Sequence, residues 1–302
     1  MATDTGINTA TAPLSAAPAD FFALLKPRVM SLVVFTGAVG MLVAPGSLHP
    51  VLAVVAVLCI AVGAGASGCI NMWYERDVDA IMQRTRHRPI PSGRVEPQSA
   101  LEFGVALAVA SVMVMGLAVN WAAAGLLALA IVFYVFVYTI WLKRRTPQNI
   151  VIGGASGAFP PMIGWAAVVG DVTLASIALF AIIFFWTPPH FWSLALYRSG
   201  DYEAAGIPML PVVAGHETTR RHILFYSLLM LPLSLAPWFL GASGLLYAAG
   251  AAVLSVIFVG GAVRVLQTKS ETAARWMFKY SILYLALLFA LLIADKAVTG
   301  FL

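Results

Sequence analysis

The densest group of charged residues in this chain follows an apolar run that is long enough to cross a lipid bilayer. Three carboxylates, Glu75, Asp77 and Asp79, lie close together, and several arginines follow at once. Ionisable side chains at such a depth are costly unless they bind something of opposite charge, so they mark a functional site. Carboxylates suit a divalent cation, and arginines suit an anion. The combination predicts a binding site for a metal-complexed diphosphate.

The spacing of three polar residues indicates how the metal would be held. Asn71, Glu75 and Asp79 lie four residues apart. On an α-helix this spacing puts them on one stripe, so that an amide and two carboxylates face one cavity. Mg²⁺ takes oxygen ligands and usually only one or two carboxylates, with phosphate and water completing its shell. We expect these three residues to be metal ligands, and Asp77 to point elsewhere if the helix continues. The alternative is a solvated helix end whose acids pair with nearby arginines.

Basic side chains at three places in the sequence could hold the diphosphate. Arg84 and Arg88 come directly after the acids, and Arg198 lies in a second polar loop, residues 193–221. Lys143 and Arg144 follow the fourth apolar segment. Lys143 and Arg144 could simply mark the orientation of the chain in the membrane. Their position also suits an anion site, because arginine binds phosphate in a bidentate manner.

Two further residues are candidates for binding a metal or a macrocycle. Asp201 in the second polar loop could contribute to another metal position, or it could belong to an ordinary salt-bridged loop. His190 lies in an apolar segment directly after Pro188 and Pro189. Two prolines remove backbone hydrogen bonds and open a polar spot in such a helix. We consider a contact between His190 and the iron or a propionate of a porphyrin, against the simpler role of a packing residue.

The composition requires that these residues be positioned by membrane helices. The chain has 302 residues, of which 61% are hydrophobic and 10% charged, whereas about 25% are charged in a typical soluble domain. The apolar runs are continuous and do not alternate, which argues against a membrane β-barrel. We predict an all-α polytopic membrane bundle of about nine transmembrane helices. The expected spans are roughly 28–45, 50–72, 98–120, 122–141, 150–169, 173–192, 222–241, 244–267 and 276–294.

The basic residues predict how the bundle is oriented. If the N-terminus is cytoplasmic, every Lys and Arg except Lys296 falls in a cytoplasmic segment. This bias predicts an N-terminus inside and a C-terminus outside. The net charge of +5 then reflects orientation and does not indicate a nucleic-acid partner. We expect a disordered cytoplasmic tail at 1–20 and a single membrane domain at 21–302. A mitochondrial transit peptide would be rich in Arg, so the tail favours a bacterial inner (plasma) membrane.

The acidic stripe resembles the first motif of the UbiA superfamily of intramembrane prenyltransferases, Asn-x-x-x-Asp-x-x-x-Asp. Here Glu75 replaces the first Asp. Longer strings resemble the branch of that superfamily that farnesylates protohaem IX; they lie at 71–93, 142–154, 186–192 and 201–211. The second motif of the superfamily usually carries several acids four residues apart, whereas here Tyr197 and Ala205 flank Asp201. This departure puts a complete second Mg²⁺ site in doubt and is similar to the acid-poor second motif of the haem branch.

The resemblance implies a reaction in which Mg²⁺ assists ionisation of farnesyl diphosphate, and a vinyl group of protohaem IX takes the farnesyl group to give haem O. It also implies a place in haem A and terminal oxidase biogenesis, with a haem A synthase as a possible partner. The catalytic and metal-binding residues would be Asn71, Glu75, Asp79 and Asp201, those that bind diphosphate Arg84, Arg88, Lys143, Arg144 and Arg198, and the haem-binding residue His190.

Other functions remain as alternatives. A prenyltransferase of this kind could use another acceptor, such as a quinone precursor or chlorophyllide. A secondary transporter could use the acids as coupling-ion sites, but transporters usually place charge near the middle of the bilayer, whereas here it lies at one interface. A haem-delivery or assembly scaffold would bind haem without transferring a prenyl group.

Overall fold

The computed structural model describes residues 16–299, and within that range the chain is helical without any strand. Eight helices are long and apolar enough to cross a membrane, and a ninth crossing results if the bent pair α1 and α2 forms one span. This confirms the predicted bundle of about nine spans. The long helices are α2 (Pro27–Val43), α3 (Pro50–Tyr74), α5 (Pro97–Ala118), α6 (Trp121–Val132) with η1 (Phe133–Leu142), α7 (Asn149–Val169), α8 (Leu174–Tyr197), α11 (Gly215–Phe239), α12 (Leu245–Thr268) and α13 (Glu271–Thr299).

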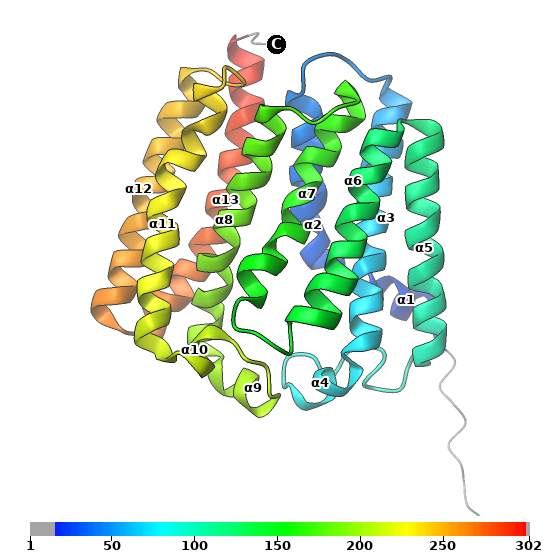
Figure 1. Ribbon diagram of the computed structural model, residues 1–302, viewed down its shortest axis with the longest axis vertical. Helices are drawn as coiled ribbons and strands as arrows, with labels where there is room; N and C mark the ends of the chain where they lie inside the picture. Colours follow the sequence, from blue (N-terminus) through cyan, green and yellow to red (C-terminus); the bar gives the residue numbers. More distant parts are fainter. Residues whose placement is uncertain (1–15, 300–302) are drawn as a thin grey trace, which may run out of the picture.

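Four short helices complete the fold. They are α1 (Pro18–Leu24), α4 (Arg76–Ile81), α9 (Ser199–Ala204) and α10 (Leu210–Val213). Three of them, α4, α9 and α10, lie together at one end of the bundle, between the ends of the long helices (Figure 1). The disordered tail predicted at 1–20 falls partly outside the described residues, and its last part includes the start of α1.

Local sequence signals explain where several spans begin. Pro27, Pro50 and Pro97 each occupy the first position of a helix, where the missing N–H has no partner to lose. Asn120 and Thr173 cap α6 and α8 by accepting hydrogen bonds from backbone N–H groups of the first turn. These signals account for the agreement between most predicted and observed boundaries.

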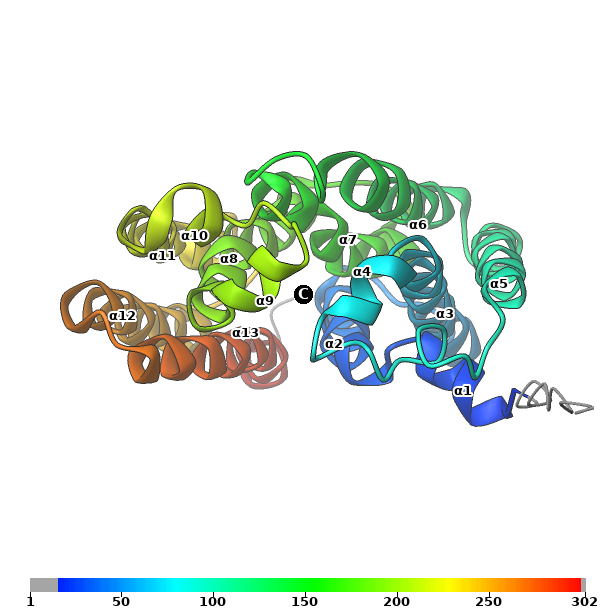
Figure 2. The same ribbon diagram turned by 90° about the horizontal axis from the view of Figure 1, so that it is seen from below.

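The helix α7 lies at the centre of the bundle, with α2 and α8 against it (Figure 2). The contact with α2 is made by the two backbones. A Cβ atom added to Gly164 would lie 2.0 Å from the carbonyl oxygen of Gly37, and one added to Gly40 would lie 2.1 Å from that of Pro161. Close approach of this kind is what small residues permit in membrane helices. The two halves of the molecule are therefore joined through helices that tolerate almost no added volume.

The winding of one span differs from the regular helix that the sequence predicts. The second half of the fourth span, Phe133–Leu142, is a π-helix. Wide turns of this type are rare and are frequent at functional sites. The residue that follows is Lys143, so the π-helix sets the direction in which this lysine points. In the sixth span, α8 continues through Pro188 and Pro189, so these prolines remove hydrogen bonds without ending the helix.

Candidate active site

The acidic stripe lies where α3 passes into α4. The helix α3 ends at Tyr74, and Glu75 has a non-helical backbone (φ −97, ψ 13) before α4 begins. The hydrogen bonds from Glu75 N to Asn71 O (3.0 Å) and from Asp79 N to Glu75 O (2.8 Å) span this junction. The three side chains therefore keep their common direction. Asn71, Glu75 and Asp79 are only 2%, 1% and 3% exposed, so the structure brings all three into the interior.

Each buried carboxylate of the stripe is paired with one basic side chain from outside the stripe. Arg88 Nη1 donates to Asp79 Oδ2 at 2.6 Å. Lys143 Nζ, which follows the π-helix, donates to Glu75 Oε2. Both bases were predicted from the sequence as diphosphate ligands. Carboxylates and phosphate oxygens attract the same donors, so these two side chains already lie where a diphosphate beside the acids would meet them.

The amide of Asn71 joins the cluster to two residues that the sequence analysis missed. Lys26 Nζ donates to Asn71 Oδ1 at 2.7 Å. Asn71 Nδ2 donates to Glu75 Oε2 at 2.8 Å and to Thr139 Oγ1 at 3.1 Å. Lys26 lies with Arg28 near the start of a span and has the pattern of an orientation marker, while Thr139 lies within the π-helix. Neither residue carried a sequence signal that singled it out.

The residues fit the metal that the family resemblance implies. Glu75 Oε1 is buried and has no hydrogen-bond partner among residues 16–299, and such an oxygen is costly to leave unpaired. Two carboxylates and an amide match the oxygen donors that Mg²⁺ accepts. In the described part of the chain, no three His, Cys, Asp or Glu side chains gather around one point. Mg²⁺ would therefore need phosphate oxygens to complete its shell, as it usually does.

Two arginines predicted to bind diphosphate lie at the rim of the site. Arg144 forms a bidentate pair with Asp77, with N–O distances of 2.6 and 2.8 Å, and its guanidinium lies 5.3 Å from the ring centroid of Tyr74. Asp77 is exposed and pairs with Arg144 and not with the buried acids, although the helix does not continue unbroken past Tyr74, the condition on which its separate direction was expected. The hydrogen bond from Arg144 holds the pKa of Asp77 below the ordinary value. Arg84 is exposed, and it forms no ion pair with any residue of the described range.

The second polar loop packs against the first, but its charged residues Arg198 and Asp201 pair with each other and not with the buried acids. Val78 and Met82 of the first loop belong to one apolar cluster with Tyr202 of α9, and α4 and α9 lie next to each other at this end (Figure 2). Asp201 pairs with Arg198 of its own loop at 3.5 Å. The structure therefore places both residues near the mouth without bringing Asp201 into the buried cluster.

His190 is held between two aromatic rings in the C-terminal half. Its ring stacks on Trp186 at 4.3 Å and on Phe278 at 4.8 Å between centroids. Its Nδ1 lies 2.7 Å from Ser281 Oγ, and the hydroxyl of Ser281 donates to the carbonyl of Phe278 at 2.6 Å. Since the hydroxyl proton is used there, Oγ accepts the Nδ1 proton, and Nε2 carries the lone pair. This tautomer is the one that could bind iron through Nε2.

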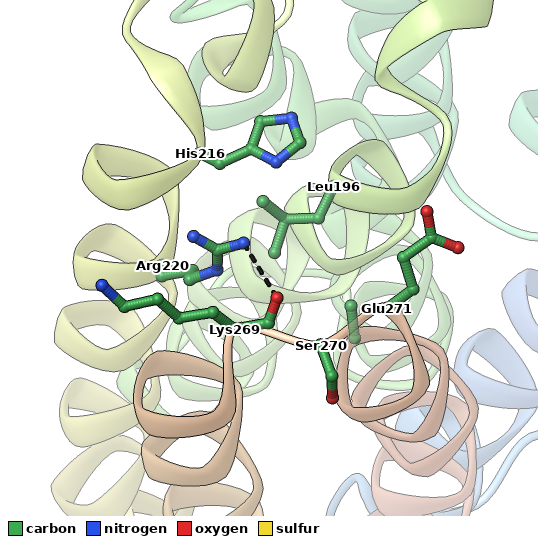
Figure 3. A pocket seen from close by; sticks show the side chains of 7 residues that line it. Leu196, His216, Arg220, Lys269, Ser270 and Glu271 are labelled. Atoms are coloured by element: carbon green, nitrogen blue, oxygen red, sulfur yellow. Dashed lines mark hydrogen bonds between the residues drawn. The ribbon is translucent and has the colours of Figure 1, made fainter.

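A second charged cluster lies at the same end of the bundle, far along the sequence. Glu217 at the start of α11 pairs with Arg220 at 3.8 Å, with Arg221 at 3.7 Å and with Lys269 at 3.1 Å. Arg220 also donates to the carbonyl of Lys269 at 3.2 Å, and both line a small pocket of about 120 Å³ beside His216 (Figure 3). The glutamate is 44% exposed, so this cluster lies in contact with solvent.

Known proteins resemble this chain over nearly its whole length. It is 59% identical over 295 residues to a protein of Granulibacter bethesdensis named protoheme IX farnesyltransferase, covering 95% of this chain and 93% of that protein. A protein of the same name from Parvibaculum lavamentivorans is 61% identical over 281 residues, covering 92% and 88%.

Solved structures share the fold at low sequence identity. One from work on digeranylgeranylglyceryl phosphate synthase has a TM-score of 0.77 at 17% identity and covers 92% of this chain and 97% of that one. A UbiA homolog from Archaeoglobus fulgidus bound to GPP and Mg²⁺ has a TM-score of 0.68 at 20% identity, covering 91% and 99%. The sequence profile of the UbiA prenyltransferase family matches residues 33–288. With its acidic stripe buried among bases inside a membrane bundle, the chain belongs to the UbiA prenyltransferase family.

Proposed function

We propose that this protein transfers the farnesyl group of farnesyl diphosphate to a vinyl group of protohaem IX and so makes haem O. The observation that carries the proposal is the buried cluster in which Asn71, Glu75 and Asp79 each meet a basic side chain. A site with both signs of charge suits a metal-bound diphosphate. The choice of protohaem as acceptor is supported by the name of relatives that are about 60% identical over almost the entire chain.

Some side chains of the cluster would bind the metal and others the diphosphate. Asn71, Glu75 and Asp79 would hold Mg²⁺, which supplies positive charge against the negative charge that builds on the leaving diphosphate. Lys143 and Arg88 are placed to donate to diphosphate oxygens. Such prearranged donors stabilise the transition state more than the ground state, because the charge on the leaving oxygen grows as the bond breaks. Arg84, Arg144 and Arg198 at the rim, and Asp201 beside them, are assigned to guiding or completing this site.

The apolar bundle provides the conditions that an allylic cation needs. The spans that carry the site are strongly apolar, and exclusion of water protects a reactive carbon from premature capture. His190 is assigned to haem binding through Nε2, since Ser281 occupies Nδ1. The farnesyl chain and the macrocycle are both lipid-soluble, which explains why their site lies inside a membrane protein.

The cellular setting follows from charge and relatives. We place the protein in a bacterial inner membrane with its N-terminus and the acidic cluster on the cytoplasmic side and its C-terminus outside, because the bases gather at the ends expected inside. The bacterial sources of the relatives agree with this setting. Haem O made here would pass to a haem A synthase, which is therefore a proposed partner in the supply of haem A to terminal oxidases.

Incubation of the purified protein with protohaem IX, farnesyl diphosphate and Mg²⁺ tests the proposal. We expect a haem product in which a vinyl group has become a hydroxyethylfarnesyl group, with a mass increased by one farnesyl group and one hydroxyl taken from water, while diphosphate is released. We expect no product after chelation of the metal. Prenylation of a phenolic acid instead of haem would show a different acceptor. Haem binding without any transfer would show a carrier, and uptake of a solute by proteoliposomes without a product would show a transporter.

A further inference from the structure

Lys26 occupies an unusual backbone position next to the acidic stripe. It forms the junction of α1 and α2, which meet at an angle of 55°. Its φ and ψ of 52 and 53 lie in the left-handed region, which few residues other than glycine adopt. It also precedes Pro27, and a proline favours an extended conformation for the residue before it. A backbone of this kind persists only where its surroundings determine it, and such positions gather at functional sites.

The surroundings that determine it are two glycines of α3. A Cβ atom added to Gly68 would lie 3.3 Å from Cδ of Lys26, and one added to Gly65 would lie 3.1 Å from Cβ of Leu25. The small residues of this helix therefore make room for the α1–α2 junction. The stem of Lys26 lies along the turn before Asn71, which brings its ammonium group to the amide oxygen at 2.7 Å.

The charges around Lys26 do not balance without an anion. The charged groups that act on it are Glu75, Asp79, Lys143 and Arg88. Glu75 and Asp79 already have their own partners in Lys143 and Arg88, so Lys26 is left with a neutral amide. With Lys26 protonated, the five groups together carry one more positive than negative charge. Burying an excess charge is costly, and a magnesium-bound prenyl diphosphate, which keeps a net negative charge, would neutralise it.

We propose that Lys26 is a diphosphate-binding residue that couples binding of the metal to binding of the diphosphate, an inference that rests on the proposed function. The ammonium holds the oxygen of Asn71 in the arrangement described here and passes to a diphosphate oxygen when that amide oxygen serves the metal. The lysine stem is flexible and its charge compact, so a short movement is enough. Each ligand then prepares the site for the other, and the coupling is reciprocal.

Calorimetric titration of the full chain in detergent tests the coupling through binding alone. The probes are Mg²⁺ by itself and the unreactive farnesyl thiolodiphosphate with and without Mg²⁺. Replacement Lys26→Met keeps most of the stem and removes the charge. We expect it to weaken binding of the analogue in Mg²⁺ by about ten- to a hundredfold, the usual worth of a hydrogen bond to a charged group. Affinity for Mg²⁺ alone should stay the same or rise, because no ammonium then competes for Asn71.

The matched control is Arg28→Met, which removes the same charge two residues along from an exposed side chain. It should bind the analogue like the wild type, and an equal loss in both variants would overturn the assignment. The variant Lys26→Gln keeps a donor for Asn71 without the charge, so it decides the question if Lys26→Met does not fold. If a folded Lys26→Gln protein binds the analogue as tightly as the wild type, with the same coupling between metal and diphosphate, the proposed role of Lys26 is refuted while the proposed function is untouched. Failure of the wild type to bind the analogue would instead refute the proposed function.

Discussion

The two charged clusters at one end of this bundle contain the same kinds of side chain but differ in burial. Around Glu75 and Asp79 the carboxylates are almost fully buried, and one partner, Lys143, comes from a distant part of the chain while the other, Arg88, lies in the following loop. Around Glu217 the pairs are 3.1 to 3.8 Å long and open to solvent. Exposed pairs contribute little to stability, whereas burying charge is costly even when it is paired. An acidic residue near a membrane surface is therefore informative about function only when its burial is known.

The largest expected effect comes from removing an acid of the buried cluster. Asp79→Ala should lower Mg²⁺-dependent farnesyl transfer by more than about a hundredfold, because it would delete a proposed metal ligand and with it charge stabilisation at the leaving group. The matched change in the exposed cluster, Glu217→Ala, should leave turnover within about twofold. Initial rates with haem and farnesyl diphosphate, together with a melting curve for each variant, provide the measurement. Near-normal turnover of Asp79→Ala would remove this residue from the site.

Loss of a buried base should affect stability as well as turnover. Lys143→Met leaves Glu75 buried without its counter-charge, which should cost about 3 kcal/mol of unfolding free energy. Adding Glu75→Gln should recover much of this loss without restoring turnover, because the charge to be compensated is gone. Thermal unfolding of the two single variants and the double variant measures the coupling. Additive losses would mean that the pair is not formed in the membrane protein.

A smaller and more selective effect is expected in the C-terminal half. His190→Ala should weaken haem binding by about tenfold, the scale of a lost ligand-shell contact, while leaving the affinity for farnesyl thiolodiphosphate unchanged. Spectrophotometric titration with haem gives the first affinity and calorimetry the second. Ser281→Ala serves as the control, since it removes the Nδ1 partner and keeps the imidazole. Equal loss of both ligands in His190→Ala would return this residue to a packing role.

The smallest effect should follow Asp77→Asn. Asp77 is 61% exposed, so its pair with Arg144 contributes less than about 1 kcal/mol after screening by solvent. Because the pKa of Asp77 is lowered by the hydrogen bond from Arg144, this contribution is present above the unfolded-state value of about 4 and is lost as pH falls through the lowered pKa. Melting temperatures of wild type and variant should therefore converge in acid. Divergence on acidification would contradict the assigned pair.

The sequence predicts those features of the fold and site that depend on residues close together in the chain. Span lengths follow from apolar runs, and the common direction of Asn71, Glu75 and Asp79 follows from helical spacing. Arg88 could be anticipated because it is only nine residues from its partner Asp79. Lys143 was predicted as a basic side chain at the same membrane face, although its partner could not be named.

What the sequence did not predict depends on tertiary packing. Lys26 reaches the site because glycines of another helix accept its stem, and nothing near position 26 encodes that fit. Thr139 enters through a π-helix, which apolar periodicity does not distinguish from a regular span. The pairing of Asp201 with Arg198 rather than with the buried acids also depends on how two loops pack, and loop packing leaves no periodic pattern.

The π-helix before Lys143 separates two properties of a membrane span that usually go together. Apolar length decides whether a segment crosses the bilayer, but winding decides which way the side chain at its end faces. Each residue of a π-helix advances the rotation less than a residue of an α-helix does, and the segment here runs for 10 residues. A span of the same hydropathy wound as a regular helix would cross equally well and aim its terminal lysine in another direction. Substitutions that restore regular winding in Phe133–Leu142 could therefore disconnect the lysine from Glu75 while leaving insertion into the membrane intact.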